Sequence, residues 1–313
     1  MGMGQLKVLF VGVGSIAKRH IRNLYRIAGK RELSITVDAF RRGINTIPAD
    51  GVNKEYTELS DVPCDYDAIF ITNPTGQHLD TLKQFHNKGK NFFIEKPVVS
   101  LTQLKEAGEF RLYPDHVYYV ACPLRYSPVI QYIKNHVELD SVISIRSISS
   151  SYLPDWRAGK DYRMTYSAHK DMGGGVSIDL VHEWDYLTYL FGWPKKVECM
   201  MGKKSSLEID SEDYAVYIAE YKDKLLELHL DYFGRKTIRE IQLFTREDTI
   251  IGDIANNKVR YLLQGEEINF SEGRDDYQIR ELEYFLDAIT GQVKTGNCYL
   301  HGIRVLCLTQ GVV

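Results

Sequence analysis

A short glycine turn near the beginning of the chain has the residue types that let a backbone approach a phosphate group. In Gly12-Val13-Gly14-Ser15-Ile16-Ala17, the first glycine permits a tight turn and the second lets a pyrophosphate come close to the main chain. Ala17 is small enough for a helix to pack closely on a strand. The predicted chemistry is dinucleotide binding, with contacts from Gly12, Gly14, Ser15 and Ile16.

The segments on either side of the turn support this interpretation. Residues 6–11 form a short apolar run, which is typical of a parallel strand covered on both faces. Apolar residues then recur at helical spacing from Ile16 to Ala28, and Gly29 follows as a stop signal. This order places the positive end of a helix at the expected phosphate site.

The end of the next expected strand, residues 34–40, bears on which dinucleotide is bound. Asp38 lies roughly 20 residues or more beyond the glycines and could accept hydrogen bonds from the ribose hydroxyls of NAD. Arg41 and Arg42 could instead pair with the 2′-phosphate of NADP. The two arginines favour NADP, while a turn aspartate followed by solvated arginines is the alternative.

Two further strands are expected at residues 66–72 and 91–94, and polar residues follow each of them. Because the carboxyl ends of parallel strands share one edge, Asn73, Glu95 and Lys96 should lie along the ligand-binding edge of a single sheet. A helix containing His78 follows the first of these strands.

These segments resemble the glucose-fructose oxidoreductase, inositol dehydrogenase and rhizopine-catabolism family, written Gfo/Idh/MocA. The resemblance rests on the glycine turn, Thr72-Asn73-Pro74 with His78, Glu95-Lys96-Pro97, and Asp171-Met172-Gly173-Gly174-Gly175 with Asp179, His182 and Asp185. It implies an α/β protein: an N-terminal Rossmann domain with a doubly wound parallel sheet, then an α+β domain with a large, mostly antiparallel open sheet. The implied dinucleotide contacts add Thr72, Asn73, Pro74, His78, Glu95 and Lys96.

The same resemblance implies NAD(P)-linked oxidation or reduction of a sugar, cyclitol or sugar derivative, with Lys96 and His182 catalytic. An imidazole titrates near neutrality, so His182 would exchange the hydroxyl proton, and Lys96 would stabilise the developing charge on the reacting oxygen. Many family members have three residues between the aspartate and the histidine, whereas this chain has two between Asp179 and His182. Helical spacing still puts Asp179, a third catalytic candidate, on the face of His182. The alternatives are a structural histidine and a solvated Lys-Pro turn.

A narrower resemblance covers residues 152–157, 161–163, 166–168 and 182–186. It points to a branch associated with nonulosonate and surface-polysaccharide pathways, and so to a sugar or nucleotide-sugar substrate. Residues 156–171 are expected to form a long loop, in which Trp156 would stack on a sugar and arginines would hold an anionic group. The alternative is an Ω-loop that uses Trp156 and Tyr162 as its own core. The substrate-binding candidates are Arg125, Trp156, Arg157, Tyr162, Tyr166, Asp179 and His182.

Length and composition bound the remaining predictions. A chain of 313 residues suggests two domains, placed at 1–122 and 123–313, with alternating runs in the second that indicate an antiparallel meander.

With 39 basic and 42 acidic side chains, nucleic acid is not an expected partner. No apolar run is long enough for a membrane helix, so we expect a cytoplasmic protein. The five cysteines are scattered and show no ligand spacing with the histidines, which predicts no metal site. The broad sheet predicts a homodimer or homotetramer.

Two other functions remain open at this stage. One is a non-catalytic NAD(P)-binding regulator, against which the presence of both Lys96 and His182 argues. The other is an enzyme that cleaves or epimerises a glycoside with tightly bound NAD. Such an enzyme would show no net reduction of its cofactor.

Overall fold

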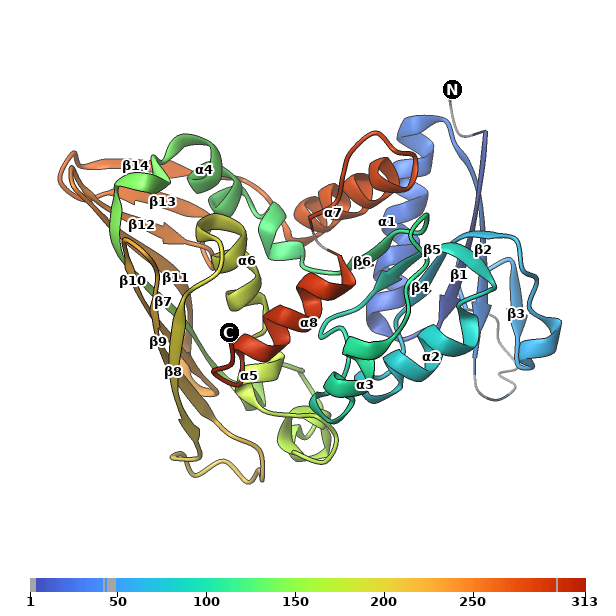
Figure 1. Cartoon of the computed structure of the whole chain (residues 1–313), viewed down its shortest axis with the longest axis horizontal. Coiled ribbons are helices and arrows are strands. Elements are labelled where there is room, and N and C mark those ends of the chain that lie inside the picture. Colours follow the sequence, from blue (N-terminus) through green and yellow to red (C-terminus); the bar gives the residue numbers. More distant parts are fainter. Residues whose placement is uncertain (1–3, 42, 44–48, 297) are drawn as a thin grey trace. The chain divides into compact units, whose positions relative to one another are not determined.

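The computed structural model describes residues 4–41, 43, 49–296 and 298–313, and the chain divides into two compact units. The first comprises residues 1–121 and 274–303, and the second comprises residues 122–273 and 304–313. Figure 1 colours these segments along the sequence.

A six-stranded parallel sheet forms the centre of the first unit. Its strand order is β3-β2-β1-β4-β5-β6, so the chain winds outward from β1 in both directions. The strands are β1 (Gln5–Val11), β2 (Ser34–Phe40), β3 (Lys54–Tyr56), β4 (Tyr66–Ile71), β5 (Gly89–Ile94) and β6 (Tyr118–Val120). Most side chains of β1 and β4 are buried, as the apolar runs predict for strands covered on both faces.

Helices cover this sheet as the doubly wound prediction requires. They are α1 (Ser15–Arg31), α2 (His78–Phe85), α3 (Leu104–Glu109) and α7 (Arg274–Ile289), and Figure 1 shows α1 and α7 together on one side of the sheet. The core is aromatic: Phe70 stacks on Phe10 with ring centroids 4.5 Å apart and on Phe93 at 4.9 Å. On the α2 side, Phe85 packs edge-on against Phe40 at 5.1 Å.

Helix α7 corrects the predicted domain division, because it packs in the first unit although it follows the whole second sheet in sequence. Its Phe285 is fully buried and meets Phe93 edge-on at 5.3 Å. Asp275 at its start pairs with Arg22 and Arg26 of α1 at 3.0 and 3.2 Å. The second predicted domain therefore ends near residue 273 and resumes within the last helix.

An eight-stranded sheet forms the second unit, in the order β14-β13-β12-β11-β7-β10-β9-β8. Neighbouring strands are antiparallel except for β7 and β10, which run parallel and so depart from the predicted simple meander. The strands are β7 (Val142–Tyr152), β8 (Lys196–Gly202), β9 (Tyr214–Glu220), β10 (Leu225–Asp231), β11 (Phe233–Thr245), β12 (Thr249–Asp253), β13 (Lys258–Tyr261) and β14 (Glu266–Asn269).

Helices of the second unit pack on one face of this sheet. They are α4 (Pro128–His136), α5 (Val176–Asp179) and α6 (His182–Phe191), while α8 (Tyr299–Leu308) crosses the division between the units. The chain also makes short 3-10 turns at Leu59–Asp61, Thr75–Gln77, Leu101–Gln103, Pro123–Tyr126, Leu139–Ser141, Leu153–Asp155, Tyr162–Met164 and Tyr166–Ala168. Among the described residues, no helix has the length and apolar character needed to cross a membrane. The predicted fold class is confirmed in both units.

Candidate active site

The glycine turn is held against the end of strand β4. Gly12 has φ +89°, and a Cβ at this position would lie 2.8 Å from the Cα of Asn73. The Gly12 amide donates to the Phe40 carbonyl at 3.0 Å, and the Thr72 hydroxyl donates to the Gly12 carbonyl at 2.7 Å. Only glycine fits this position, so the ends of β1, β2 and β4 fix the turn together.

The N-terminus of α1 fits a dinucleotide pyrophosphate. Gly14 caps the helix, no side chain of the described residues bonds to its free amides, and its first turn carries no acidic residue. A Cβ added at Gly14 would meet no atom within 4 Å, and Ser15 beside it is exposed, while Ile16 is half-buried. The open backbone and the helix dipole therefore offer an anion site where the sequence predicts one.

Asp38 does not lie where a ribose-binding carboxylate is expected. It occupies the interior of β2, two residues before the strand ends, and is only 4% exposed. Its carboxylate accepts a hydrogen bond from the Tyr66 hydroxyl at 2.8 Å, and burial together with Asp38 raises the pKa of that phenol. This placement corrects the predicted role of Asp38 as a ribose ligand.

Arg41 is the first residue after β2. Its guanidinium lies 2.9 Å from Glu55 Oε1, which also accepts the Ala49 amide at 2.8 Å. Burial opposes the charge of Glu55, but these hydrogen bonds outweigh it and lower the pKa of the carboxyl. Arg42, the other predicted phosphate ligand, lies outside the described residues.

Asn73 and His78 form a connected group after β4. The Asn73 side chain donates to the Thr81 hydroxyl at 2.7 Å, and Pro74 precedes the 3-10 turn that leads into α2. His78 is 2% exposed, with Nε2 2.9 Å from the Asn73 carbonyl and Nδ1 3.0 Å from the Pro97 carbonyl. This burial leaves His78 little surface for the predicted contact with the dinucleotide.

Glu95, Lys96 and Pro97 follow β5, and the Lys96-Pro97 peptide bond is cis. Glu95 Oε1 lies 2.6 Å from Nε2 of the buried His20, and Glu95 Oε2 accepts the Lys96 amide at 3.3 Å. Burial raises the pKa of Glu95, but His20 and the Lys96 charge outweigh it, so the pKa is lowered overall. The contacts of Glu95 thus join α1 to the turn Glu95-Lys96-Pro97, which we call the lysine turn, and the role of Glu95 as a cofactor contact stays a prediction.

In the second unit, Asp179 ends α5 and His182 begins α6. The connection is not one continuous helix, because Leu180 has φ −98° and ψ 25°; this corrects the single helical face predicted for the two residues. Asp179 is 4% exposed and accepts a hydrogen bond from the Tyr232 hydroxyl at 2.5 Å. His182 is half-buried in the first turn of α6.

Aromatic side chains surround Asp179. The ring of Trp156 meets Tyr232 edge-on at 5.2 Å, and the guanidinium of Arg157 lies 5.5 Å from the ring centre of Tyr166. Burial, with the Asp179 charge and hydrogen bond next, raises the pKa of Tyr166. Four predicted residues, Trp156, Arg157, Tyr166 and Asp179, thus form one cluster within this unit, since Asp179 contacts the phenols of both Tyr166 and Tyr232. Sequence reasoning missed Tyr232, which lies 53 residues from Asp179 and belongs to no recognised motif.

Three of the predicted substrate residues, Arg125, Trp156 and Tyr162, make hydrogen bonds to other residues of the protein. Arg125 is 5% exposed and makes a bidentate ion pair with Asp185 at 2.7 and 2.6 Å, and its role as a substrate contact stays a prediction. The Tyr162 hydroxyl accepts the Glu208 amide at 3.1 Å, and Trp156 donates to the Ser151 hydroxyl at 2.9 Å. Trp156 and Tyr162 therefore brace their loop, as the Ω-loop alternative expects, although Trp156 keeps 37% of its surface exposed.

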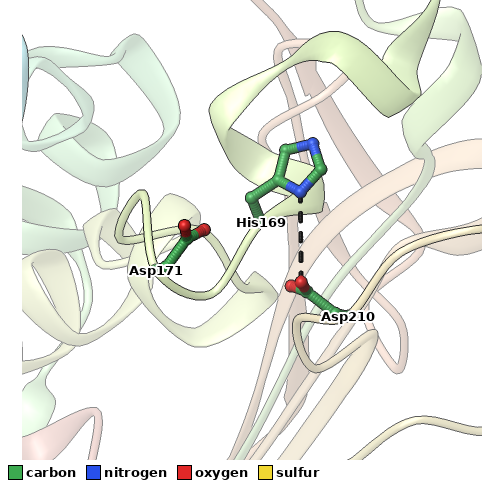
Figure 2. A group of neighbouring side chains, drawn as sticks. All are labelled: His169, Asp171 and Asp210. Carbon is green, nitrogen blue, oxygen red and sulfur yellow. Dashed lines mark ion pairs between the residues drawn. The ribbon is translucent and has the colours of Figure 1, made fainter.

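A further group of ionisable side chains lies beside this loop, comprising His169, Asp171 and Asp210 (Figure 2). Their ligand atoms lie within 4.8 Å of one another, a spacing that could hold a metal ion and that the predicted absence of metal did not foresee. His169 Nδ1 is 4.0 Å from Asp210 Oδ2, while its Nε2 faces the Arg163 carbonyl at 2.7 Å. Both aspartates are exposed, so an ion pair at the surface accounts for the contacts.

The first unit has a parallel sheet and a glycine turn that leaves the first amides of α1 open. The second unit has an open, mostly antiparallel sheet and the buried carboxylate of Asp179. Together these features are typical of the class of two-domain dinucleotide-binding oxidoreductases. Residues 6–111 match the oxidoreductase family with an NAD-binding Rossmann fold, and residues 130–241 match the GFO/IDH/MocA C-terminal domain. The chain belongs to the Gfo/Idh/MocA family.

Known proteins of similar sequence and structure agree with this assignment. The scyllo-inositol 2-dehydrogenase (NAD(+)) of Bacillus subtilis (strain 168) is 24% identical over 195 residues, which cover 60% of this chain and 54% of that protein. The chain spans about half the length of the curated relatives that it matches first.

Two solved structures share the fold. A levoglucosan dehydrogenase in complex with NADH and levoglucosan aligns with a TM-score of 0.83 at 15% identity, covering 98% of this chain and 96% of that one. A UDP-N-acetylglucosamine 3-dehydrogenase from Acidithiobacillus ferrooxidans aligns with a TM-score of 0.75 at 18% identity and the same coverage, 98% and 96%.

Proposed function

We propose that the protein is an NAD(P)-dependent dehydrogenase or reductase of a sugar, cyclitol or nucleotide-sugar derivative. The observation that carries the proposal is the open helix terminus at Gly14, because it offers a phosphate site on the same helix whose His20 contacts Glu95, the neighbour of Lys96, at 2.6 Å. Similar proteins include dehydrogenases of inositol, levoglucosan and UDP-N-acetylglucosamine.

The proposed roles follow from the chemistry of each group. A bound nicotinamide exchanges a hydride with the carbinol carbon of the substrate. His182 takes the hydroxyl proton during oxidation and returns it during reduction, and Lys96 donates a hydrogen bond to the oxygen on which negative charge develops. Asp179, which accepts a hydrogen bond from the Tyr232 hydroxyl at 2.5 Å, is the third proposed catalytic group, as the family resemblance implies.

The second-unit aromatic cluster is the proposed sugar contact. Trp156 has an exposed part of its ring available, and Arg157 over Tyr166 places a cation beside it. A stacking face with an adjacent guanidinium suits a sugar that carries an anionic group, such as a nucleotide sugar or a sugar acid. The resemblance to the branch linked with surface-polysaccharide pathways favours the nucleotide sugar.

The test is nicotinamide absorbance with NAD, NADP and their reduced forms against a panel of cyclitols, free sugars, sugar acids and nucleotide sugars. We expect turnover with at least one member and net change of the cofactor. A protein that binds the dinucleotide but turns over no member would support the regulator alternative. Substrate conversion without net change of a retained cofactor would support a glycoside-cleaving or epimerising enzyme.

A further inference from the structure

The buried imidazole of His78 spans two loops that the proposed reaction uses. Nε2 lies 2.9 Å from the carbonyl of Asn73, directly after β4, and Nδ1 lies 3.0 Å from the carbonyl of Pro97, directly after Lys96. His78 is the first residue of α2, so the rigid helix fixes the position of the ring. One side chain therefore ties together the ends of two neighbouring strands.

The lysine turn is held on both sides of Lys96. Before the lysine, the Glu95 carboxylate lies 2.6 Å from Nε2 of His20, which α1 carries. After it, the Pro97 carbonyl faces His78. A flexible four-carbon side chain acts reproducibly on a substrate only when its backbone is fixed, and the two histidines fix the residues that flank Lys96.

The two carbonyls compete for one proton. A carbonyl oxygen only accepts, whereas a neutral imidazole has one N–H and one lone pair. Burial lowers the pKa of His78, and the backbone hydrogen bonds to Asn73, Pro97 and Val98 together with the Glu95 charge oppose that effect without reversing it. At neutral pH the ring therefore donates to one carbonyl at a time, and the function of the contact depends on which carbonyl it serves.

We infer that His78 is a positioning residue, which donates from Nδ1 to the Pro97 carbonyl and thereby sets the Lys96 ammonium for the reacting oxygen. The inference rests on the proposed function, because it gives Lys96 a reaction to serve. His78 itself touches neither substrate nor dinucleotide, since 2% of its surface is exposed.

The two amide residues separate the contacts of the ring. In His78→Asn the amide nitrogen occupies roughly the place of Nδ1 and can still donate to Pro97. In His78→Gln it reaches roughly the place of Nε2 and serves the Asn73 carbonyl instead. His86→Asn, at the other end of α2, is the control for replacing a histidine of this helix, because its Nε2 contacts the Tyr118 hydroxyl at 2.5 Å.

We expect His78→Gln to lower kcat by about tenfold or more, since a misplacement of about 1 Å can cost up to about 100-fold. His78→Asn should stay within about threefold of the parent and of His86→Asn. The dissociation constant for NADH, followed by fluorescence, should change less than threefold in all three variants, because the phosphate turn is untouched. The reverse order, with Asn worse than Gln, would assign the function to the Asn73 carbonyl and overturn the inference, as would equal losses accompanied by equal falls in Tm.

A second readout does not depend on turnover. Reductive ¹³C-methylation labels lysine amines, and the Lys96→Arg variant identifies the Lys96 resonance. With NADH bound, we expect this resonance to shift in His78→Gln and to stay at the parental position in His78→Asn. If the parent turns over no sugar but the resonances behave in this way, the proposed function fails and the positioning role stands. If neither substitution shifts the Lys96 resonance, the positioning role of His78 is excluded even if the enzyme is active.

Discussion

Arg41 shows how a single residue can choose between two closely related cofactors. It is the first side chain after β2, and Glu55 holds its guanidinium at 2.9 Å. A guanidinium has five donors in a planar fork, so the ion pair leaves donors for a second anion. Because Asp38 is buried against Tyr66, we predict that Arg41 recognises a 2′-phosphate at this strand end.

Replacing both Arg41 and Arg42 with alanine should weaken NADP binding much more than NAD binding. A charge-assisted contact with phosphate is worth about 1.5–3 kcal/mol, so we expect the NADP dissociation constant to rise by about tenfold or more. Fluorescence titration of both reduced dinucleotides measures the ratio. Equal losses for the two cofactors would exclude a role in recognising the phosphate.

Single side chains also show where prediction from sequence stops. The spacing of Asp38 from the glycines suits a ribose ligand, but spacing cannot say that Tyr66 supplies a hydrogen bond to the Asp38 carboxylate. Arg125 is another residue that was predicted to bind substrate. Its partner Asp185 lies 60 residues away, and only the fold brings the two together.

At the scale of elements, β1, the glycine turn and α1 are coupled by backbone geometry. Gly12 and Gly14 lie two residues apart but have different surroundings. Substitutions at the two positions should therefore separate effects on the stability of the fold from effects on dinucleotide binding. An added Cβ collides with Asn73 at Gly12, where φ is +89°, whereas it meets nothing within 4 Å at Gly14. At Gly14 φ is −82°, which any residue adopts.

We expect Gly12→Ala to destabilise the protein by about 1–3 kcal/mol, because it combines a strained backbone with a steric clash. Gly14→Ala should change stability by less than about 0.5 kcal/mol, yet weaken NADH binding, since its methyl group occupies the approach of the pyrophosphate. Denaturant unfolding and fluorescence titration on both variants check the two effects. If Gly14→Ala bound NADH like the parent, the phosphate would not lie at this turn.

Elements with strong periodicity were predictable, and their partners were not. The apolar run before Gly12 and the helical spacing behind it match β1 and α1, because both patterns reflect local burial, although α1 continues past the predicted stop at Gly29 to Arg31. Helix α7 is also amphipathic, but its pattern cannot reveal that Phe285 packs against β5 rather than on the second sheet, which is nearer in sequence. The parallel pairing of β7 and β10 was missed for the same reason, since alternation along a strand carries no information on its neighbours.

At the scale of the whole molecule, one face of the second sheet bears on assembly. Met200, Ile218 and Leu225 lie on neighbouring strands β8, β9 and β10 and are 68%, 53% and 42% exposed. They share a face with the Arg146–Glu227 ion pair, while Tyr217 and Leu228 on the opposite face are at most 1% exposed. An apolar strip of this kind on a half-covered sheet is typical of a subunit interface.

We predict that a second copy of the chain covers this strip, giving a homodimer or homotetramer. Ile218→Asp would bury an unpaired charge in such an interface and should shift the assembly toward monomer. Sedimentation velocity over a range of concentrations measures the change, with Glu220→Gln at the end of the same strand as the control. A parent that stays monomeric at all concentrations would contradict the prediction.

The last prediction concerns the two proposed catalytic residues, one from each unit. Lys96 belongs to the first unit and His182 to the second, and the proposed reaction requires both to act on one transferring proton and its oxygen. Each of Lys96→Met and His182→Asn should lower kcat by about 100-fold or more, the scale of a lost acid/base or electrostatic group. The double variant should lose less than the product of the two single losses, because residues that act as one unit are not additive. His182→Asn should bind NADH like the parent in fluorescence titration, since the imidazole is assigned to the substrate. If His182→Asn kept near-parental turnover on a substrate that the parent accepts, His182 would be structural, and the acid/base would have to be sought at Lys96 or Tyr166.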